Sequence, residues 1–248
     1  MEPVYTPVIG LARVLFAFQG LRITLRGLEH VPRTGGAVMA VNHTGYFDFT
    51  YAGLAGVDAG RLVRFMAKKS IWANPVARPL MTGMHHIPVD REAGQESFDQ
   101  ALAALRSGEI VGVFPEATIS RSFELKDFKS GAARMAQEAG VPVLPTTIWG
   151  SQRVWTKGHP RRMGRHGIPL LITVGAPIPV AADEDATEAT ARIRVAMQTQ
   201  LHADQEGYPA WPPAERHLLP ARLGGTAPTP EEAAALDAAE RKARRTAG

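Results

Sequence analysis

Cysteine is absent from the 248-residue sequence. This absence excludes disulfide bonds, thiolate metal sites and a covalent cysteine intermediate. A long hydrophobic run is also missing, because the best candidate, Val8 to Phe18, has only 11 residues and contains Arg13. A helix that crosses a bilayer needs roughly 20 mainly apolar residues. We therefore expect neither disulfides nor a transmembrane segment.

The composition is that of a folded chain with an excess of positive charge. Hydrophobic residues make up 45% and charged residues 21% of the sequence, and the formal net charge is +4. These values are typical of a globular protein, and the length suits one large domain with appendages. The charge favours an anionic partner such as a phosphorylated metabolite, a membrane surface or nucleic acid. Because no recognised nucleic-acid module is present, we expect no nucleic-acid partner.

The hydrophobic pattern alternates between strand and helix signals. Such alternation predicts an α/β fold, in which helices flank a central mixed, largely parallel sheet. The predicted strands are residues 21–28, 37–41, 62–67, 85–89, 110–114, 143–149 and 170–174. The predicted helices are residues 46–54, 74–81, 97–106, 130–138 and 231–245, and the second of them has Pro75 at its first position. A further helix is expected to begin at the acids 183–185 and to bury Ile193, Met197 and Leu201.

Two segments flank a predicted central domain of residues 21–207. Residues 1–20 are expected to form an N-terminal amphipathic helix, which either packs on the core or lies in the membrane interface. Residues 208–248 comprise a proline-rich segment and an alanine-rich C-terminal helix with acids first and bases last. The basic end is either a solvated helix end or a contact with an anionic membrane.

A candidate catalytic pair follows the apolar run 37–41. Asp48 lies five residues after His43, and on a continuous helix two such side chains point about 140° apart. A bend at Gly45 would place His43 at a strand end and Asp48 in the first turn of the next helix. Asp48 could then accept the proton of one ring nitrogen, while the other nitrogen takes a proton from a substrate hydroxyl. The alternative is a surface histidine beside a helix-capping aspartate.

Two further motifs follow predicted strands. In Ile87–Arg91, Arg91 could bind a phosphate at the carboxyl end of its strand, where α/β proteins place their sites. In Phe114–Ser120, Glu116 could hold acceptor hydroxyls or orient a basic neighbour. The alternatives are a surface Asp–Arg ion pair in the first motif and a helix-capping acid in the second.

The order of these motifs, followed by Val141–Pro145, resembles the glycerophospholipid acyltransferase family of the lysophosphatidic acid acyltransferase type. The resemblance covers residues 37–150. It implies transfer of a fatty acyl group from acyl-CoA or acyl carrier protein to a glycerol hydroxyl. By motif position, His43 resembles the general base of the family and Asp48 its partner. The implied acceptor-binding residues are Arg91, Glu116 and Thr118.

The resemblance also implies a reaction without an acyl-enzyme intermediate, a metal or a bound cofactor. Enzymes of this family form no acyl-enzyme intermediate, which agrees with the absence of cysteine. Their chemistry uses no metal, and no cofactor apart from the acyl thioester as co-substrate. His85 and His86 are adjacent on a predicted strand, so their side chains are expected on opposite faces. We therefore predict neither a metal site nor a bound cofactor.

The third motif departs from the family pattern Phe-Pro-Glu-Gly-Thr-Arg. Here Ala117 replaces the glycine and Ile119 replaces the arginine that is generally assigned to the acceptor phosphate. Our hypothesis is that Arg121, Lys129 or both supply the missing charge. Lys68, in the stretch 60–89 that has five Lys or Arg residues and no acid, is a further candidate for binding the anionic substrates.

The sequence thus predicts an acyltransferase of phospholipid synthesis that acts on lysophosphatidate or glycerol 3-phosphate. We expect it to be peripheral, at the cytoplasmic face of the membrane. Two alternatives remain open. One is an acyltransferase for another lysolipid or glycolipid acceptor, and the other is a non-catalytic membrane-surface protein with the same fold.

Overall fold

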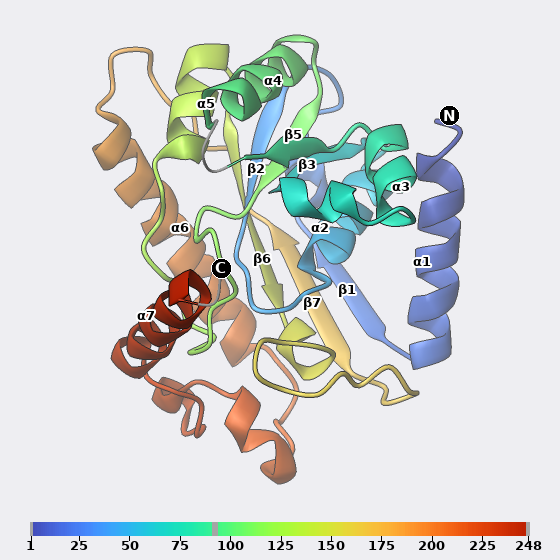
Figure 1. Ribbon diagram of the computed structural model, residues 1–248, viewed down its shortest axis with the longest axis vertical. Coiled ribbons are helices and arrows are strands. Elements are labelled where there is room, and N and C mark those ends of the chain that lie inside the picture. The colour runs from blue at the N-terminus through green and yellow to red at the C-terminus, as the bar shows by residue number, and fades with distance from the viewer. Residues whose placement is uncertain (1, 91–93, 247–248) are drawn as a thin grey trace.

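A seven-stranded sheet runs through the centre of the molecule (Figure 1). The computed structural model describes residues 2–90 and 94–246, with side chains up to residue 243. Neighbouring strands are parallel except β6 and β7, which confirms the predicted mixed, largely parallel sheet. In spatial order the strands are β1 (Arg22–Arg26), β7 (Pro169–Val174), β6 (Val143–Trp149), β2 (Ala37–Val41), β5 (Ile110–Val113), β3 (Val63–Lys68) and β4 (Ile87–Val89).

Helices cover both faces of the sheet, because successive strand side chains point to opposite sides. In β2, Val38 and Ala40 join the core beneath α4 (Gly94–Arg106), α5 (Gly131–Ala139) and α6 (Ala186–Glu206). Met39 and Val41 join the core beneath α1 (Tyr5–Gln19) and α2 (Asp48–Asp58). The other helices are α3 (Ala77–Gly83) and α7 (Pro230–Thr246). Short 3-10 turns span Leu28–His30, Lys69–Ala73, Ser151–Arg153, Pro213–Leu218 and Ala221–Leu223.

The segment between β3 and β4 differs most from its prediction. His85 and His86 do not lie on a strand, because their backbone N–H groups bond Thr82 and Met81 and close α3. His85 has a left-handed backbone with φ of 57°. The helix also begins at Ala77 rather than near Pro75, since the Asn74 side chain accepts the N–H groups of Val76 and Ala77 at 2.9 and 3.1 Å.

Helix α1 has two different apolar sides. Tyr5 and Phe16 are buried against the body of the protein, whereas Leu11, Val14 and Phe18 are 71%, 66% and 65% exposed. The exposed residues are spaced three and four apart, so they form one stripe. None of the described helices is both long enough and apolar enough to span a bilayer. The two explanations for residues 1–20 are therefore compatible: one side packs on the core, and the other presents apolar surface to the outside.

Helix α6 shows how the C-terminal half is held to the sheet. The Asp185 side chain caps its first turn by accepting the N–H groups of Thr187 and Glu188 at 2.8 and 3.1 Å. Ile193, Met197 and Leu201 are buried in its apolar face, as the sequence predicted. Replacing a capping aspartate or a buried leucine by alanine therefore removes a defined interaction.

We predict that Leu201→Ala lowers the free energy of unfolding by about 2–5 kcal/mol, because it leaves a cavity under α6. Val195 lies on the same helix but is 61% exposed, so Val195→Ala is the matched control, with an expected change within about 0.5 kcal/mol. Urea denaturation monitored by circular dichroism measures both values. Equal losses for the two variants would contradict the burial of Leu201.

Candidate active site

The predicted site residues lie at one edge of the sheet. Strands β2, β5 and β6 run parallel, so their carboxyl ends meet there. His43 follows β2, Glu116 follows β5, and Ser151 follows β6. Parallel sheets commonly carry their sites at this edge.

The side chains of His43 and Asp48 contact each other. Nδ1 of His43 lies 3.0 Å from Oδ2 of Asp48, the first residue of α2. The same oxygen accepts the backbone N–H groups of Thr44 and Gly45, both at 2.7 Å. Asp48 is fully buried, whereas the His43 side chain is 20% exposed. Because Oδ2 holds the proton on Nδ1, the arrangement leaves Nε2 as the basic nitrogen of the ring.

Gly45 is needed for space. Its backbone is not in the left-handed region, so the bend that the sequence predicted here does not require a positive φ. A Cβ atom at this position would lie 3.0 Å from Oγ of Ser151 and 3.2 Å from Oδ1 of Asp48. The loop after β2 is further tied to the loop after β6, because Thr44 and Ser151 share a hydroxyl hydrogen bond of 3.0 Å and Thr156 donates to the Thr44 carbonyl at 2.6 Å.

Glu116 joins the third motif to the histidine. Its Oε1 accepts the backbone N–H of His43 at 2.9 Å, and its Oε2 accepts that of Lys126 at 3.1 Å. The backbone N–H of Ser120 donates to the His43 carbonyl at 2.7 Å. The Phe114 ring stacks on the imidazole with centroids 4.2 Å apart. Glu116 thus positions His43 and the loop after β5, while its predicted contact with acceptor hydroxyls stays a prediction.

Burial decides the protonation of Glu116. The carboxyl group is 5% exposed, and desolvation raises its pKa from 4.5 to about 7, although the two backbone hydrogen bonds oppose the shift. At neutral pH the group is therefore poised between its charged and neutral forms, unlike an exposed glutamate.

The two departures in the third motif have different structural consequences. Ala117 has a left-handed backbone with φ of 60°, a conformation that glycine adopts without strain. Ile119 is only 6% exposed, so its side chain packs inside the protein and contributes no charge to the site.

The predicted cationic residues separate into two groups. Arg121 and Lys126 both form ion pairs with Asp237. Nζ of Lys126 also donates to the Thr118 hydroxyl at 2.7 Å, so Arg121 is linked to Thr118 through Asp237 and Lys126. Lys129 is exposed at the start of α5. Lys68 is exposed at the end of β3, opposite Val89 of β4. Arg91 lies outside the described residues.

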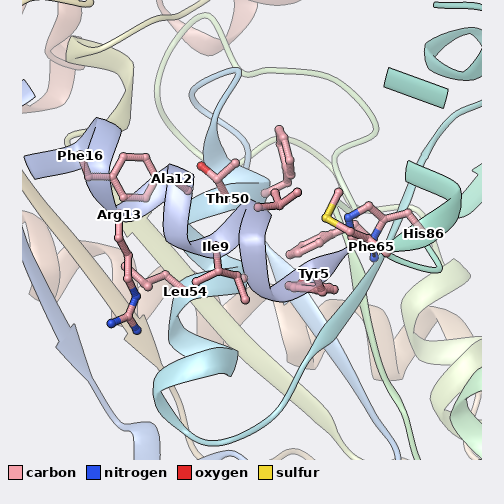
Figure 2. A pocket seen from close by; sticks show the side chains of 13 residues that line it. Tyr5, Ile9, Ala12, Arg13, Phe16, Thr50, Leu54, Phe65 and His86 are labelled. Carbon is pink, nitrogen blue, oxygen red and sulfur yellow. Dashed lines mark hydrogen bonds between the residues drawn. The ribbon is translucent and has the colours of Figure 1, made fainter. Parts of the chain in front are cut away.

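An apolar cavity lies between α1, α2 and β3 (Figure 2). Phe65, which lines it, stacks on Phe114 with centroids 6.1 Å apart, and Phe114 in turn stacks on His43. The polar side chains in its wall are satisfied or neutral. The Tyr5 hydroxyl donates to the Val63 carbonyl at 3.0 Å. His86 accepts the N–H of Phe65 at 3.0 Å, and burial lowers its pKa to about 4. The cavity is therefore uncharged next to the aromatic stack, apart from Arg13, which pairs with Asp58.

The Acyltransferase family matches residues 22–149, more than half of the chain. The chain belongs to this family. The match includes His43 and Asp48, called the dyad below, and the whole third motif. This member of the family has Ala117 and Ile119 at two positions of that motif.

Named relatives support the same assignment. Over 139 residues the chain is 31% identical to the 1-acyl-sn-glycerol-3-phosphate acyltransferase of Bacillus subtilis, covering 56% of this chain and 67% of that protein. It is 29% identical to the chloroplastic enzyme LPAT1 of Arabidopsis thaliana, covering 61% of this chain and 42% of the relative. It is 26% identical to the 1-acyl-sn-glycerol-3-phosphate acyltransferase alpha of Homo sapiens, covering 73% of this chain and 64% of the relative. The chain thus spans less than two thirds of the plant and human relatives.

The fold resembles a solved structure. The 1-acyl-sn-glycerophosphate acyltransferase PlsC from Thermotoga maritima superimposes with a TM-score of 0.67, covering 84% of this chain and 80% of that one. The identity is 19%, so this likeness shows the shared fold.

Several contacts of the site were not found from the sequence. Lys157 and the acids Asp237 and Glu240 join the loop of the third motif, although α7 begins more than 100 residues later. The one sequence signal for them is the stretch 151–167, which contains Lys157 and has five Lys or Arg residues and no acid. Among the described residues, no three His, Cys, Asp or Glu side chains are grouped so that they could hold a metal ion.

The raised pKa of Glu116 predicts a pH dependence of stability. The neutral form is favoured in the folded state, so its contribution is complete below about pH 4.5 and is lost as pH rises to about 7. We expect the wild-type free energy of unfolding to fall by about 3 kcal/mol over this window relative to Glu116→Gln.

Urea titrations at several pH values between 4.5 and 7.5 test this difference. Glu138→Gln, at a half-exposed acid on α5, is the control and should keep the wild-type slope. Parallel pH profiles for the wild type and Glu116→Gln would show that folding does not raise the pKa of Glu116.

Proposed function

We propose that this protein transfers a fatty acyl group from a thioester, acyl-CoA or acyl carrier protein, to a glycerol hydroxyl of lysophosphatidate or glycerol 3-phosphate. The observation that carries the proposal is the contact between His43 and the buried Asp48 in a chain of the acyltransferase family. The names of the relatives supply the substrate class. The proposed reaction uses neither a metal nor a cofactor beyond the thioester.

The geometry supports general-base chemistry at His43. Nε2 takes the proton of the acceptor hydroxyl as the oxygen attacks the thioester carbonyl, and Asp48 stabilises the imidazolium that forms. The carbon–sulfur bond then breaks, and His43 returns the proton to the departing thiolate. Such base catalysis is worth about 10²–10⁴ in rate. Stacking on Phe114 and the hydrogen bonds to Asp48 and Glu116 hold the ring in place for this step.

We assign substrate binding to the surrounding polar residues. Thr118 and Arg121 belong to the loop after β5, which Glu116 joins to His43. Lys129, which precedes α5, and Lys68, at the end of β3, are exposed cations, and Arg91 stays a candidate on the grounds of its motif alone. The side of the molecule that we assign to the fatty chain is the uncharged cavity of Figure 2, because its wall includes Phe65, which stacks on Phe114.

The exposed stripe of α1 supports a peripheral position on a membrane, which we propose to be the cytoplasmic face. Leu11, Val14 and Phe18 would enter the interface, and burial of such side chains contributes about 1.5–3 kcal/mol each. The neighbouring α3 begins beside Val76, which is 71% exposed, and carries the exposed base Arg78. Figure 1 shows α1 and α3 on the same side of the molecule.

For the reaction, we predict that His43→Ala lowers kcat by about 10²–10⁴ with labelled palmitoyl-CoA and lysophosphatidate, because the base is lost. The exposed His166 provides the control, and His166→Ala should keep the wild-type rate. Mass spectrometry of products from a panel of acceptors identifies the acceptor and the position acylated. A folded His43→Ala protein with wild-type kcat would refute the proposed reaction.

For the membrane, we predict that Leu11→Ser combined with Phe18→Ser weakens binding to vesicles of phosphatidylcholine and phosphatidylglycerol at least about 10-fold. Val195, exposed on α6 on the other side of the sheet, is the control, and Val195→Ser should bind like the wild type. Co-sedimentation with the vesicles measures the partition. Unchanged binding of the double variant would exclude the α1 stripe as the membrane contact.

A further inference from the structure

A cluster of one buried and four partly buried charges joins α7 to the loops that follow β5 and β6. Figure 1 shows α7 beside the loop that follows β5. Asp237 accepts hydrogen bonds from Lys126 at 2.6 Å, Lys157 at 2.8 Å and Arg121 at 3.2 Å. Glu240, one turn later on α7, binds Arg121 at 2.9 Å and Lys157 at 2.7 Å. Three cations from two loops therefore converge on two carboxylates of one helix.

The carboxylate of Asp237 is held in its charged form. Its side chain is only 5% exposed, and burial alone would raise its pKa. Hydrogen bonds and attraction from Lys126 and Lys157 outweigh that cost and lower the pKa to about 2. The acid is thus ionised at any pH near neutrality, and the three cations are neutralised mainly by α7.

The cluster adjoins the dyad. Lys126 donates its Nζ to the Thr118 hydroxyl at 2.7 Å and its backbone N–H to Glu116, whose other oxygen binds the backbone of His43. The cations are therefore joined to the dyad through the third motif, whereas Ile119, at the motif position of the family's arginine, is buried and supplies no charge.

The two acids of α7 resemble a phosphate monoester in charge. Together they carry −2, and a phosphate monoester carries about −1.5 to −2 at neutral pH. Two lysines and an arginine suit such a group, because charge-assisted hydrogen bonds to phosphate oxygens are strong. Removal of α7 would leave three adjacent cations and one hydroxyl beside the dyad.

The contacts of α7 make such removal feasible. Among its described side chains, residues 230–243, only Ala233 and Asp237 are buried. The buried stripe continues with the half-buried Glu240, so the helix is attached mostly through charges and very little through apolar surface. Ion pairs that involve partly exposed Lys and Arg side chains contribute little net stability, so little is lost when another dianion takes the place of the two carboxylates.

We propose that Arg121, Lys126, Lys157 and Thr118 form the binding site for the phosphate of the acceptor, and that α7 is an autoinhibitory latch whose Asp237 and Glu240 occupy it. The phosphate of the substrate displaces the two carboxylates and releases α7. This inference rests on the proposed function, and it adds two lysines and a regulatory helix to the site.

Binding of glycerol 3-phosphate to the full chain, measured by calorimetry, tests the latch without turnover. The double variant Asp237→Asn/Glu240→Gln should bind at least about 10-fold more tightly than the wild type, because its competent state is always populated. Adding Lys157→Ala to this variant should weaken binding at least about 10-fold. Glu231→Gln, which removes an exposed acid from the first turn of α7, should match the wild type.

Hydrogen exchange of the wild-type protein gives a readout that needs no variant. Saturating glycerol 3-phosphate should increase amide exchange in residues 231–243. The same measurement with inorganic phosphate and with lysophosphatidate in micelles shows whether the free ion or the lipid head group displaces α7 more effectively. Increased exchange with glycerol 3-phosphate, inorganic phosphate or lysophosphatidate supports the site. Unchanged affinity in the double variant together with unchanged exchange would overturn the latch.

These outcomes are separable from those for the proposed function. Tighter binding and faster exchange without any acyl transfer would keep the phosphate site and reject the acyltransferase. Acyl transfer with a wild-type acceptor KM in Asp237→Asn/Glu240→Gln, and no change in α7 exchange, would reject the latch and keep the acyltransferase.

Discussion

Oδ2 of Asp48 accepts three N–H groups at once, and the rest of the site depends on this arrangement. A carboxylate that is fully buried is tolerated only when hydrogen bonds replace the water it has lost. Thr44 and Gly45 supply two of these bonds and His43 supplies the third. The same contacts bend the chain between β2 and α2 and orient the imidazole. The shape of the loop and the orientation of the ring therefore depend on the same hydrogen bonds.

Glu116, which follows the neighbouring strand β5, also holds the loop of His43 through backbone hydrogen bonds. It accepts the backbone N–H of His43 with one oxygen and that of Lys126 with the other, so it ties the two loops together. Among the described residues, only backbone N–H groups donate to its buried carboxyl group, whereas Lys and Arg side chains donate to Asp237, which is why the pKa of Glu116 rises and that of Asp237 falls. Two acids of the same molecule thus titrate several pH units apart, because one meets dipoles and the other meets charges.

The surfaces around this centre differ in chemistry. On the side of α1 the exposed groups are apolar, and the cavity beneath the helix is lined mainly by aromatic and aliphatic side chains. On the side of α7 the contacts are ionic and involve cations from two loops. An acyl thioester with a long chain and an acceptor with a phosphate would each meet a matching surface, and His43 lies between them. This division agrees with the proposed reaction.

The sequence by itself determined the alternation of strands and helices, the family and the pairing of His43 with Asp48. Periodicity and short spacing report local geometry, and five residues around a bend can be judged without the fold. The end of α3 at His85 was missed, because a left-handed residue leaves no hydrophobic pattern. Only the tertiary structure decided that Glu116 holds His43 from 73 residues away and that Asp237 meets Arg121 from 116 residues away. Contacts of that range arise from the packing of whole elements, and no periodic signal along the chain records them.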